Sequence, residues 1–327
     1  VSNQMKHRSQ RTATAGRKLF FCPTSALPPI IIAAVLALPV GCDGTASQSS
    51  DPSQAEQSPD SQRINSKDLG DARRGFITTL KSRGPAPQDF EEATPMAGVQ
   101  EIRFTSGDLQ LKAWLSDDPG DDQQRPAVVY LHGGWAFAPV DWQDAAPFVD
   151  AGFVVLMPML RAENGNPGAY EGYYGEVDDA IAAGRFVAEL PYVDKENVFV
   201  AGHSVGAVLT VLAAMMPSDY KAAAALSGYL DMEHWASSGD PSRVVFDTSN
   251  PKETHLRNPM AFPASLRVPL VLYAEGGGMH EVNKTFASRA RKAGKTCELV
   301  LTGGDHMSMV APSVQHAIKW YRKQMDN

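Results

Sequence analysis

The sequence is short of cysteine and lacks the motifs that commonly bind metals and nucleotides. Only 3 cysteines occur in 327 residues, and Cys22 and Cys42 lie near the start, so we expect no disulfide framework in the body of the chain. No His-Glu-x-x-His motif and no paired Cys or His spacing is present, so we predict no metal site. Neither G-x-x-x-x-G-K nor an early G-x-G-x-x-G follows a strand, so we expect no cofactor.

Positive charge is scarce outside the first part of the chain. Residues 1–41 contain five Lys or Arg and no acidic residue, whereas the whole chain has 30 basic and 37 acidic residues. The remainder therefore has 25 basic and 37 acidic residues, a net charge of −12. Nucleic acid or an anionic membrane surface would call for a basic patch, so we expect neither as a partner. The oligomeric state is left open.

The basic start leads into an apolar segment, LPPIIIAAVLALPVGC. Its length and flanks favour a signal peptide over a transmembrane helix. Residues 38–42, LPVGC, resemble the processing site of bacterial lipoproteins, although Pro39 stands where Leu is usual. That resemblance implies a signal peptide over 1–41 and lipidation of Cys42. The alternative is an ordinary secretory signal, and both interpretations place the body outside the cytoplasm, either anchored by lipid or periplasmic or secreted.

Residues 42–70 are polar and nearly free of aliphatic and aromatic side chains. Such a segment cannot bury enough apolar surface to offset its ordering entropy, so we predict a disordered tether. The catalytic domain is expected over 71–327. It begins with DARRGFITTL, which we interpret as a short helix that packs Phe76, Ile77 and Leu80 on the domain.

From Val99 onward, short apolar runs alternate with longer amphipathic segments. VQEIRF and LQLKAWL alternate apolar and polar residues, which predicts an antiparallel hairpin at a sheet edge. The later apolar runs are typical of strands that are covered on both faces: PAVVYLH, FVVLMPML, NVFVAG, AAAALSG, VPLVLYA and CELVLTG. Helices are expected between them, over residues 141–151, 172–190, 205–216, 280–294 and 312–325.

This alternation predicts an α/β fold with one doubly wound, mostly parallel sheet and helices on both faces. The longest stretch without a clear strand is 229–265, which is rich in Trp, His, Pro and Asn. We expect it to form a small lid insertion over the carboxyl edge of the sheet.

Gly202-His203-Ser204-Val205-Gly206 fits G-x-S-x-G and lies between the strand VFVA and an apolar helix. Small residues on both sides let strand and helix approach closely around a sharp turn that exposes the serine. This context predicts Ser204 as a nucleophile. The alternative is a tight turn built from the residues that turns usually contain.

A second motif, Leu131-His132-Gly133-Gly134-Trp135, directly follows the strand PAVVY. Glycines after a strand allow backbone N–H groups to point at a developing negative charge, as an oxyanion hole requires. We expect its donors to be the N–H of Val205 and one N–H from Gly134 or Trp135.

Of the 8 histidines, His306 is best placed to act as a general base, because it follows the strand CELVL and precedes the last helix. His280 is its competitor. The acid is harder to assign, because the loop EGGGMHEVN contains no Asp. Counting back from the next helix favours Glu275, which can orient a histidine as Asp does. Glu281 and Asp231 are the alternatives.

The chain order Ser204, Glu275, His306 is the nucleophile–acid–base order of the α/β-hydrolase fold. Together with LHGGW, MPMLRAENGNPG, YVDKENVFVAGHSVG and GGDHMSM, it makes the stretch from Val99 onward resemble the prolyl-oligopeptidase and dienelactone-hydrolase-like group. Peptidases of this group often have Gly where Ala162 follows Arg161 here, and no β-propeller pattern is found.

The resemblance implies a serine hydrolase, an esterase or peptidase, that acts on a small-molecule or short peptide substrate. It would cleave esters or short peptide-like amides through an acyl-enzyme. A rival interpretation is a ligand-binding protein on a hydrolase scaffold, and the missing Asp is the feature that supports it. An acyltransferase is a third interpretation that the sequence does not separate from a hydrolase.

Overall fold

The computed structural model describes residues 67–326. The predicted signal peptide, Cys42 and most of the predicted tether lie outside this range. The last residues of the predicted tether lie inside this range and are ordered parts of the domain. Asp68 caps helix α2 (Leu69–Arg73), and Leu69 is fully buried. The expected boundary at residue 71 is therefore too late.

The segment after α2 corrects the expected helix over DARRGFITTL. Helix α2 ends at Arg73, and Gly75 adopts a left-handed φ of 70°, which glycine tolerates best and which often ends a helix. Ile77 is 86% exposed, whereas Leu80 forms an isolated bridge with Phe246. Of the three predicted contacts, Phe76 packs against the core and Ile77 does not.

The sheet has eight strands in the order β1-β2-β4-β3-β5-β6-β7-β8. The hairpin β1–β2 forms one edge, β2 is also antiparallel to β4, and every other pairing is parallel. This confirms the predicted mostly parallel sheet with an antiparallel hairpin at its edge. The strands are β1 (Val99–Ser106), β2 (Leu109–Ser116), β3 (Arg125–Leu131), β4 (Val154–Pro158), β5 (Val193–His203), β6 (Ala222–Leu226), β7 (Leu270–Ala274) and β8 (Cys297–Leu301).

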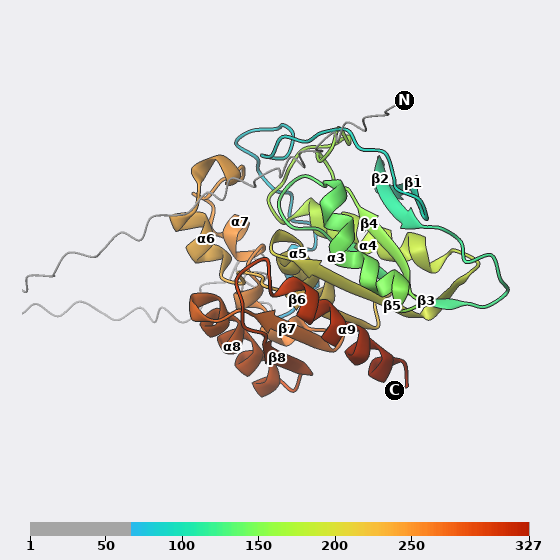
Figure 1. Ribbon diagram of the computed structural model, residues 1–327. Helices are drawn as coiled ribbons and strands as arrows, with labels where there is room; N and C mark the ends of the chain where they lie inside the picture. Colours follow the sequence, from blue (N-terminus) through green and yellow to red (C-terminus); the bar gives the residue numbers. More distant parts are fainter. Residues whose placement is uncertain (1–66, 327) are drawn as a thin grey trace, which may run out of the picture. The chain divides into compact units, whose positions relative to one another are not determined.

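Helices cover both faces of the sheet, as predicted (Figure 1). Helices α3 (Pro139–Asp150) and α9 (Val310–Met325) pack together on one face. The other face carries α4 (Gly175–Ala188), α5 (Val205–Met215) and α8 (Gly277–Lys292).

Because side chains alternate along a strand, each buried strand contributes to two separate cores. On β3, Val129 belongs to the core under α4 and α5, and Tyr130 belongs to the core under α3 and α9.

The predicted lid insertion consists of short helices between β6 and β7. Helix α6 (Met232–Ser238) and helix α7 (Pro251–His255) lie side by side in Figure 1, away from α3 and α9. Three 3₁₀ turns complete it: Pro241–Arg243, Pro259–Ala261 and Pro263–Ser265. A fully buried ion pair, with Arg257 Nη1 2.6 Å from Glu253 Oε2, holds the insertion together.

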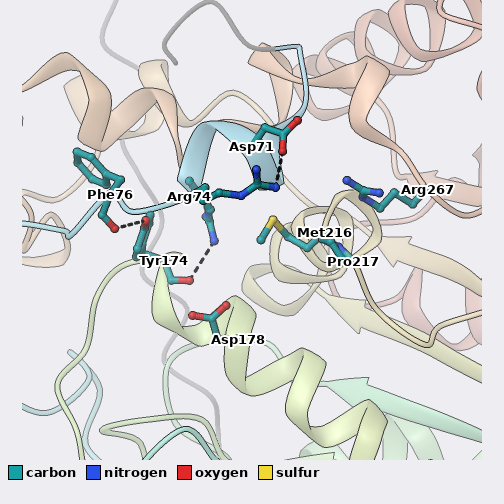
Figure 2. A pocket seen from close by; sticks show the side chains of 10 residues that line it. Asp71, Arg74, Phe76, Tyr174, Asp178, Met216, Pro217 and Arg267 are labelled. Atoms are coloured by element: carbon teal, nitrogen blue, oxygen red, sulfur yellow. Dashed lines mark hydrogen bonds and ion pairs between the residues drawn. The ribbon is translucent and has the colours of Figure 1, made fainter. Parts of the chain in front are cut away.

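A buried arginine ties α2 to the insertion and to the loop before α4. The Arg73 guanidinium donates hydrogen bonds to the carbonyls of Leu256, Tyr173 and Tyr174, and burial lowers its pKa to about 10. It lines a cleft of about 420 Å³. In Figure 2, Arg74 pairs with Asp71 at this cleft, which reaches the end of α5 that lies opposite Ser204.

Within residues 67–326, none of the helices combines the length and the apolar character that a membrane span needs.

Candidate active site

Ser204 occupies a strained turn between β5 and α5. Its φ of 56° and ψ of −112° are uncommon for a residue other than glycine. The Ser204 N–H donates to the carbonyl of Leu226 at 2.9 Å, which fixes the turn against the end of β6. Such strain persists only where the surroundings enforce it. The turn is held at the carboxyl edge of the sheet, with its serine partly buried.

The two motif glycines are required by close backbone packing. A Cβ on Gly202 would lie 2.5 Å from the carbonyl oxygen of Gly206, and a Cβ on Gly206 would lie 2.1 Å from the carbonyl oxygen of Leu131. Both distances are far below a van der Waals contact. Strand β5, helix α5 and strand β3 therefore meet at a spacing that excludes side chains.

His306 lies in the loop after β8, and its Nε2 is 3.0 Å from Ser204 Oγ. The Asp305 side chain shapes this loop by accepting hydrogen bonds from the N–H groups of Met307 and Ser308. The structure thus brings the predicted base to the predicted nucleophile at hydrogen-bond distance.

His203, which the sequence reasoning left without a role, supports the same loop. Its Nε2 lies 2.9 Å from the His306 carbonyl oxygen, and the two rings are 4.7 Å apart. A carbonyl only accepts hydrogen bonds, so His203 Nε2 donates. Its place directly before Ser204 in the motif was the available signal.

Glu275 is the first residue after β7, and its Oε1 lies 3.4 Å from His306 Nδ1. Partial burial alone would raise the pKa of this carboxyl. The nearby His306 ring with its charge, and the hydrogen bond from Ser227, outweigh burial and lower the pKa below its usual value. Glu275 is therefore an ionised carboxylate at neutral pH.

Ser227 lies between Glu275 and His306 and was missed by the sequence reasoning. Its Oγ is 2.9 Å and 2.8 Å from the two carboxylate oxygens of Glu275, and 2.7 Å from His306 Nδ1. A serine before Gly228 has the composition of an ordinary turn. The only signal was its position directly after strand β6, at the edge where the carboxyl ends of the parallel strands meet.

The alternative acids have other partners. Asp231 caps α6 and accepts from the His234 N–H at 3.1 Å. Glu281 has a 67% exposed side chain and pairs with His280 and Lys284. Within residues 67–326, neither carboxylate, nor the competing base His280, forms a hydrogen bond or ion pair with Ser204 or His306.

The turn His132-Gly133-Gly134 after β3, called the HGG turn below, lies against the nucleophile. A Cβ on Gly133 would be 3.6 Å from Ser204 Cβ and 3.0 Å from His203 Nδ1. The Trp135 N–H donates to Gln88 Oε1 at 3.1 Å, so a side chain from the segment before β1 already engages one predicted oxyanion donor. Val205 opens α5, where the first N–H groups have no partner within the helix.

A buried ion pair fixes the HGG turn from behind. His132 Nε2 lies 3.1 Å from Glu163 Oε2, and both side chains are almost fully buried. Glu163 also accepts from the Leu160 N–H at 2.7 Å. Burial alone would lower the pKa of His132, but the charge and hydrogen bond of Glu163 outweigh it and raise the pKa to about 9.

Within residues 67–326, no group of three or more His, Cys, Asp or Glu side chains is placed to hold a metal ion.

The geometry of this edge of the sheet agrees with a comparison against known families. Residues 140–326 match the model of the prolyl oligopeptidase family. The chain belongs to the prolyl oligopeptidase family. The match includes Ser204, Ser227, Glu275 and His306, and begins after the HGG turn.

Individual proteins are similar to parts of this chain in sequence or in structure. The uncharacterized peptidase YtmA of Bacillus subtilis (strain 168) is 29% identical over 137 residues, which cover 41% of this chain and 50% of that protein. A puromycin-hydrolyzing peptidase of Mycobacterium tuberculosis has a TM-score of 0.60 at 18% identity, covering 70% of this chain and 40% of the other. A thermophilic esterase of Thermogutta terrifontis has a TM-score of 0.56 at 20% identity, covering 69% and 94%.

The prolyl oligopeptidase family match confirms the resemblance predicted from the motifs, and the α/β-hydrolase fold is confirmed with it. The family supports a hydrolase of the serine-peptidase kind. The chain spans only between 20% and 50% of the length of the curated relatives it matches.

Proposed function

We propose that the chain is a serine hydrolase that cleaves ester or short peptide-like amide bonds through an acyl-enzyme intermediate. The observation that carries this proposal is the 3.0 Å contact between Ser204 Oγ and His306 Nε2 at a strained strand-to-helix turn. A nucleophile needs a base within hydrogen-bond reach, and the base needs a group that orients it. Glu275, near His306 Nδ1, supports that third role.

In the acylation step, Ser204 Oγ attacks the substrate carbonyl carbon while its proton passes to His306 Nε2. A new C–O bond forms and the carbonyl oxygen becomes an oxyanion. As the tetrahedral intermediate collapses, the bond to the alcohol or amine breaks and the proton on Nε2 moves to that leaving group. Water then repeats the attack on the acyl-Ser204 ester, again through Nε2, and releases the acid.

The oxyanion would be held by the N–H of Val205 and by one N–H of the HGG turn. The positive end of the α5 dipole lies at Val205 and favours negative charge there. For the second donor, Gly134 and Trp135 both stay candidates. The Trp135 N–H becomes accessible only when the Gln88 side chain turns away.

Replacing Ser204 with Ala tests the proposal most directly. We expect the wild-type protein to be labelled by a fluorophosphonate and to give an acyl-enzyme burst with p-nitrophenyl acetate. The Ser204→Ala variant should lose both, with turnover lowered about 10³-fold or more. Ser218→Ala is the matched control, because it removes a hydroxyl beyond the opposite end of α5.

Three outcomes separate the candidate functions. Labelling of Ser204→Ala at the wild-type level would overturn the assignment of the nucleophile. A wild-type protein that is folded but gives neither label nor burst would be a binding protein on a hydrolase scaffold. A burst whose second phase depends on an added alcohol or amine acceptor would indicate an acyltransferase.

We also propose, from the sequence of residues 1–42 alone, that the chain is exported and lipidated at Cys42. In a bacterial host, the protein with its leader should incorporate labelled palmitate and sediment with membranes. Cys42→Ser should abolish both, and Cys22→Ser should abolish neither. Unchanged labelling of Cys42→Ser would contradict lipidation at Cys42, and an exported wild-type protein without label would leave the ordinary secretory signal as the explanation.

A further inference from the structure

Ser227 is held in an unfavourable backbone conformation at the candidate active site. It directly follows β6, is 1% exposed, and has a φ of 55°. A left-handed conformation costs a residue with a side chain about 1 kcal/mol or more, and glycine would avoid this cost. The Ser227 N–H donates to the carbonyl of Tyr273 at 2.9 Å, so β7 fixes the residue in place.

Adjacent strands explain why Ser227 meets Glu275. Strands β6 and β7 are parallel, with Leu226 opposite Tyr273, so the residues that follow both strands emerge at the same edge. Glu275 directly follows β7, and the nearer oxygen of its carboxylate lies 3.4 Å from His306 Nδ1. The Ser227 hydroxyl, at 2.7 Å, is the nearer partner of Nδ1.

The number of protons determines the direction of these hydrogen bonds. A hydroxyl has one hydrogen, and an ionised carboxylate can only accept. The Ser227 hydroxyl therefore donates to Glu275 and must accept from His306, which places a hydrogen on Nδ1. In the neutral ring this leaves the lone pair on Nε2, facing the Ser204 hydroxyl. That is the tautomer a general base needs.

We propose that Ser227 is a positioning residue of the hydrolysis, which links Glu275 to His306 through its hydroxyl and fixes the histidine tautomer. The inference rests on the function proposed above. When His306 takes the proton from Ser204, Nδ1–H still donates to Ser227 Oγ, and the Ser227 hydrogen still donates to Glu275. No proton crosses Ser227, and the carboxylate acts on the ring through an ordered hydroxyl dipole.

Ser227→Gly separates this role from a role in folding. Glycine suits a φ of 55°, so the variant should keep or raise the melting temperature while it loses the hydroxyl. We expect kcat/KM with p-nitrophenyl acetate to fall about 10- to 100-fold. The acid limb of the pH profile should move to lower pH, because the imidazolium loses its acceptor. Ser227→Ala should behave alike, and Ser218→Ala should match the wild type.

A double variant tests whether Ser227 acts through Glu275. If the hydroxyl is the link, adding Ser227→Gly to Glu275→Gln should lower kcat/KM much less than it does in the wild-type background. Fully additive losses would contradict the link. Wild-type rates and an unchanged pH profile in both Ser227 variants would overturn the proposal, while fluorophosphonate labelling of the wild type would leave the proposed function standing.

A measurement that needs no turnover completes the test. In ¹⁵N-histidine correlation spectra, His306 of the wild type should carry its hydrogen on Nδ1 in the neutral form. In Ser227→Gly, the Nε2–H form should gain population. An Nε2–H ring in the wild type would overturn the proposal even if the protein has no hydrolase activity, and an unchanged tautomer in the variant would do the same.

Discussion

Glycines surround the nucleophile turn and also follow the acid, yet the two groups have opposite surroundings. At Gly202 and Gly206, an added Cβ would overlap backbone atoms at 2.5 Å and 2.1 Å. Around residues 276–278, which follow Glu275, an added Cβ would meet nothing within 4 Å. The motif glycines are therefore dictated by packing, whereas the glycines after the acid lie in open space.

This contrast explains why one half of the site is easier to find from sequence than the other. Where three backbone segments converge, few residue types fit, and a motif results. After the acid, no neighbouring atom excludes a side chain, and only the backbone φ of 126° at Gly276 and 59° at Gly277 favours glycine, so the position of the acid leaves a weak pattern. The following variants test this contrast, starting with the largest expected effect.

Gly206→Ala should have the most severe effect. The new Cβ would lie 2.1 Å from the Leu131 carbonyl oxygen, so β3 and α5 would have to separate. We expect the free energy of unfolding to fall by more than about 4 kcal/mol and soluble yield and activity to be lost. Circular dichroism melts and esterase assays would measure this. A stable, active variant would contradict the close packing of this turn.

Glu275→Gln should lower activity with little change in stability. A neutral amide cannot stabilise the imidazolium as a carboxylate does, so we expect kcat/KM to fall about 10²- to 10⁴-fold. Glu281→Gln is the matched control, because that side chain is 67% exposed and lies on the same helical segment as Lys284. Near-normal activity of Glu275→Gln would move the acid role to Glu281 or Asp231.

The ion pair behind the HGG turn should make stability depend on pH. The pKa of His132 is raised from 6.5 to about 9 in the folded protein. The protonated ring therefore stabilises the fold fully below about pH 6.5, and this contribution is lost as the pH rises through 9. We expect the free energy of unfolding to fall by up to about 3 kcal/mol across this window.

Thermal melts between pH 6 and 10 would measure that loss. His132→Gln keeps a hydrogen-bond donor toward Glu163 but does not titrate, so its stability should change less over the same window. An equal slope in the wild type and the variant would assign the pH dependence to other groups.

Gly278→Ala should have the smallest effect, and its sign should be opposite to that of Gly206→Ala. Gly278 is a helical residue of α8 with no atom near its missing Cβ. Alanine should raise the free energy of unfolding by about 0.5 kcal/mol, because it restricts the unfolded chain. Chemical denaturation would measure the change, and a clear loss of stability would mean that the first turn of α8 is closely packed.

Much of the fold could be predicted because buried strands leave continuous apolar runs. Each of the strands from β3 to β8 was expected from such a run, and the hairpin from its alternation. The lid was harder, because short helices have too few turns for a periodic pattern. Its signals were local: Asp240, Asn250 and Asn258 each cap a helical turn that begins with proline.

Within the site, the residues that follow strands at motif positions could be predicted, and their partners could not. Ser204 lies within the G-x-S-x-G motif, and His306 lies between the last strand and the last helix, so both could be located from the residues next to them. Ser227 and Gln88 contact site residues that lie on distant segments of the chain. Gln88, for example, lies 47 residues before Trp135, whose N–H donates to it. Such contacts depend on how distant segments come together in space, and they leave no pattern in the neighbouring residues of the sequence.

Gln88 also bears on how the site would discriminate between a substrate and its transition state. Its neutral carboxamide oxygen already accepts from the Trp135 N–H. With Trp135 as a donor, a neutral substrate carbonyl would merely exchange one hydrogen bond for an equal one, so this contact would add little to ground-state affinity. An oxyanion accepts a hydrogen bond roughly twice as strong. The exchange would then favour the negatively charged intermediate, and catalysis would benefit while binding would not.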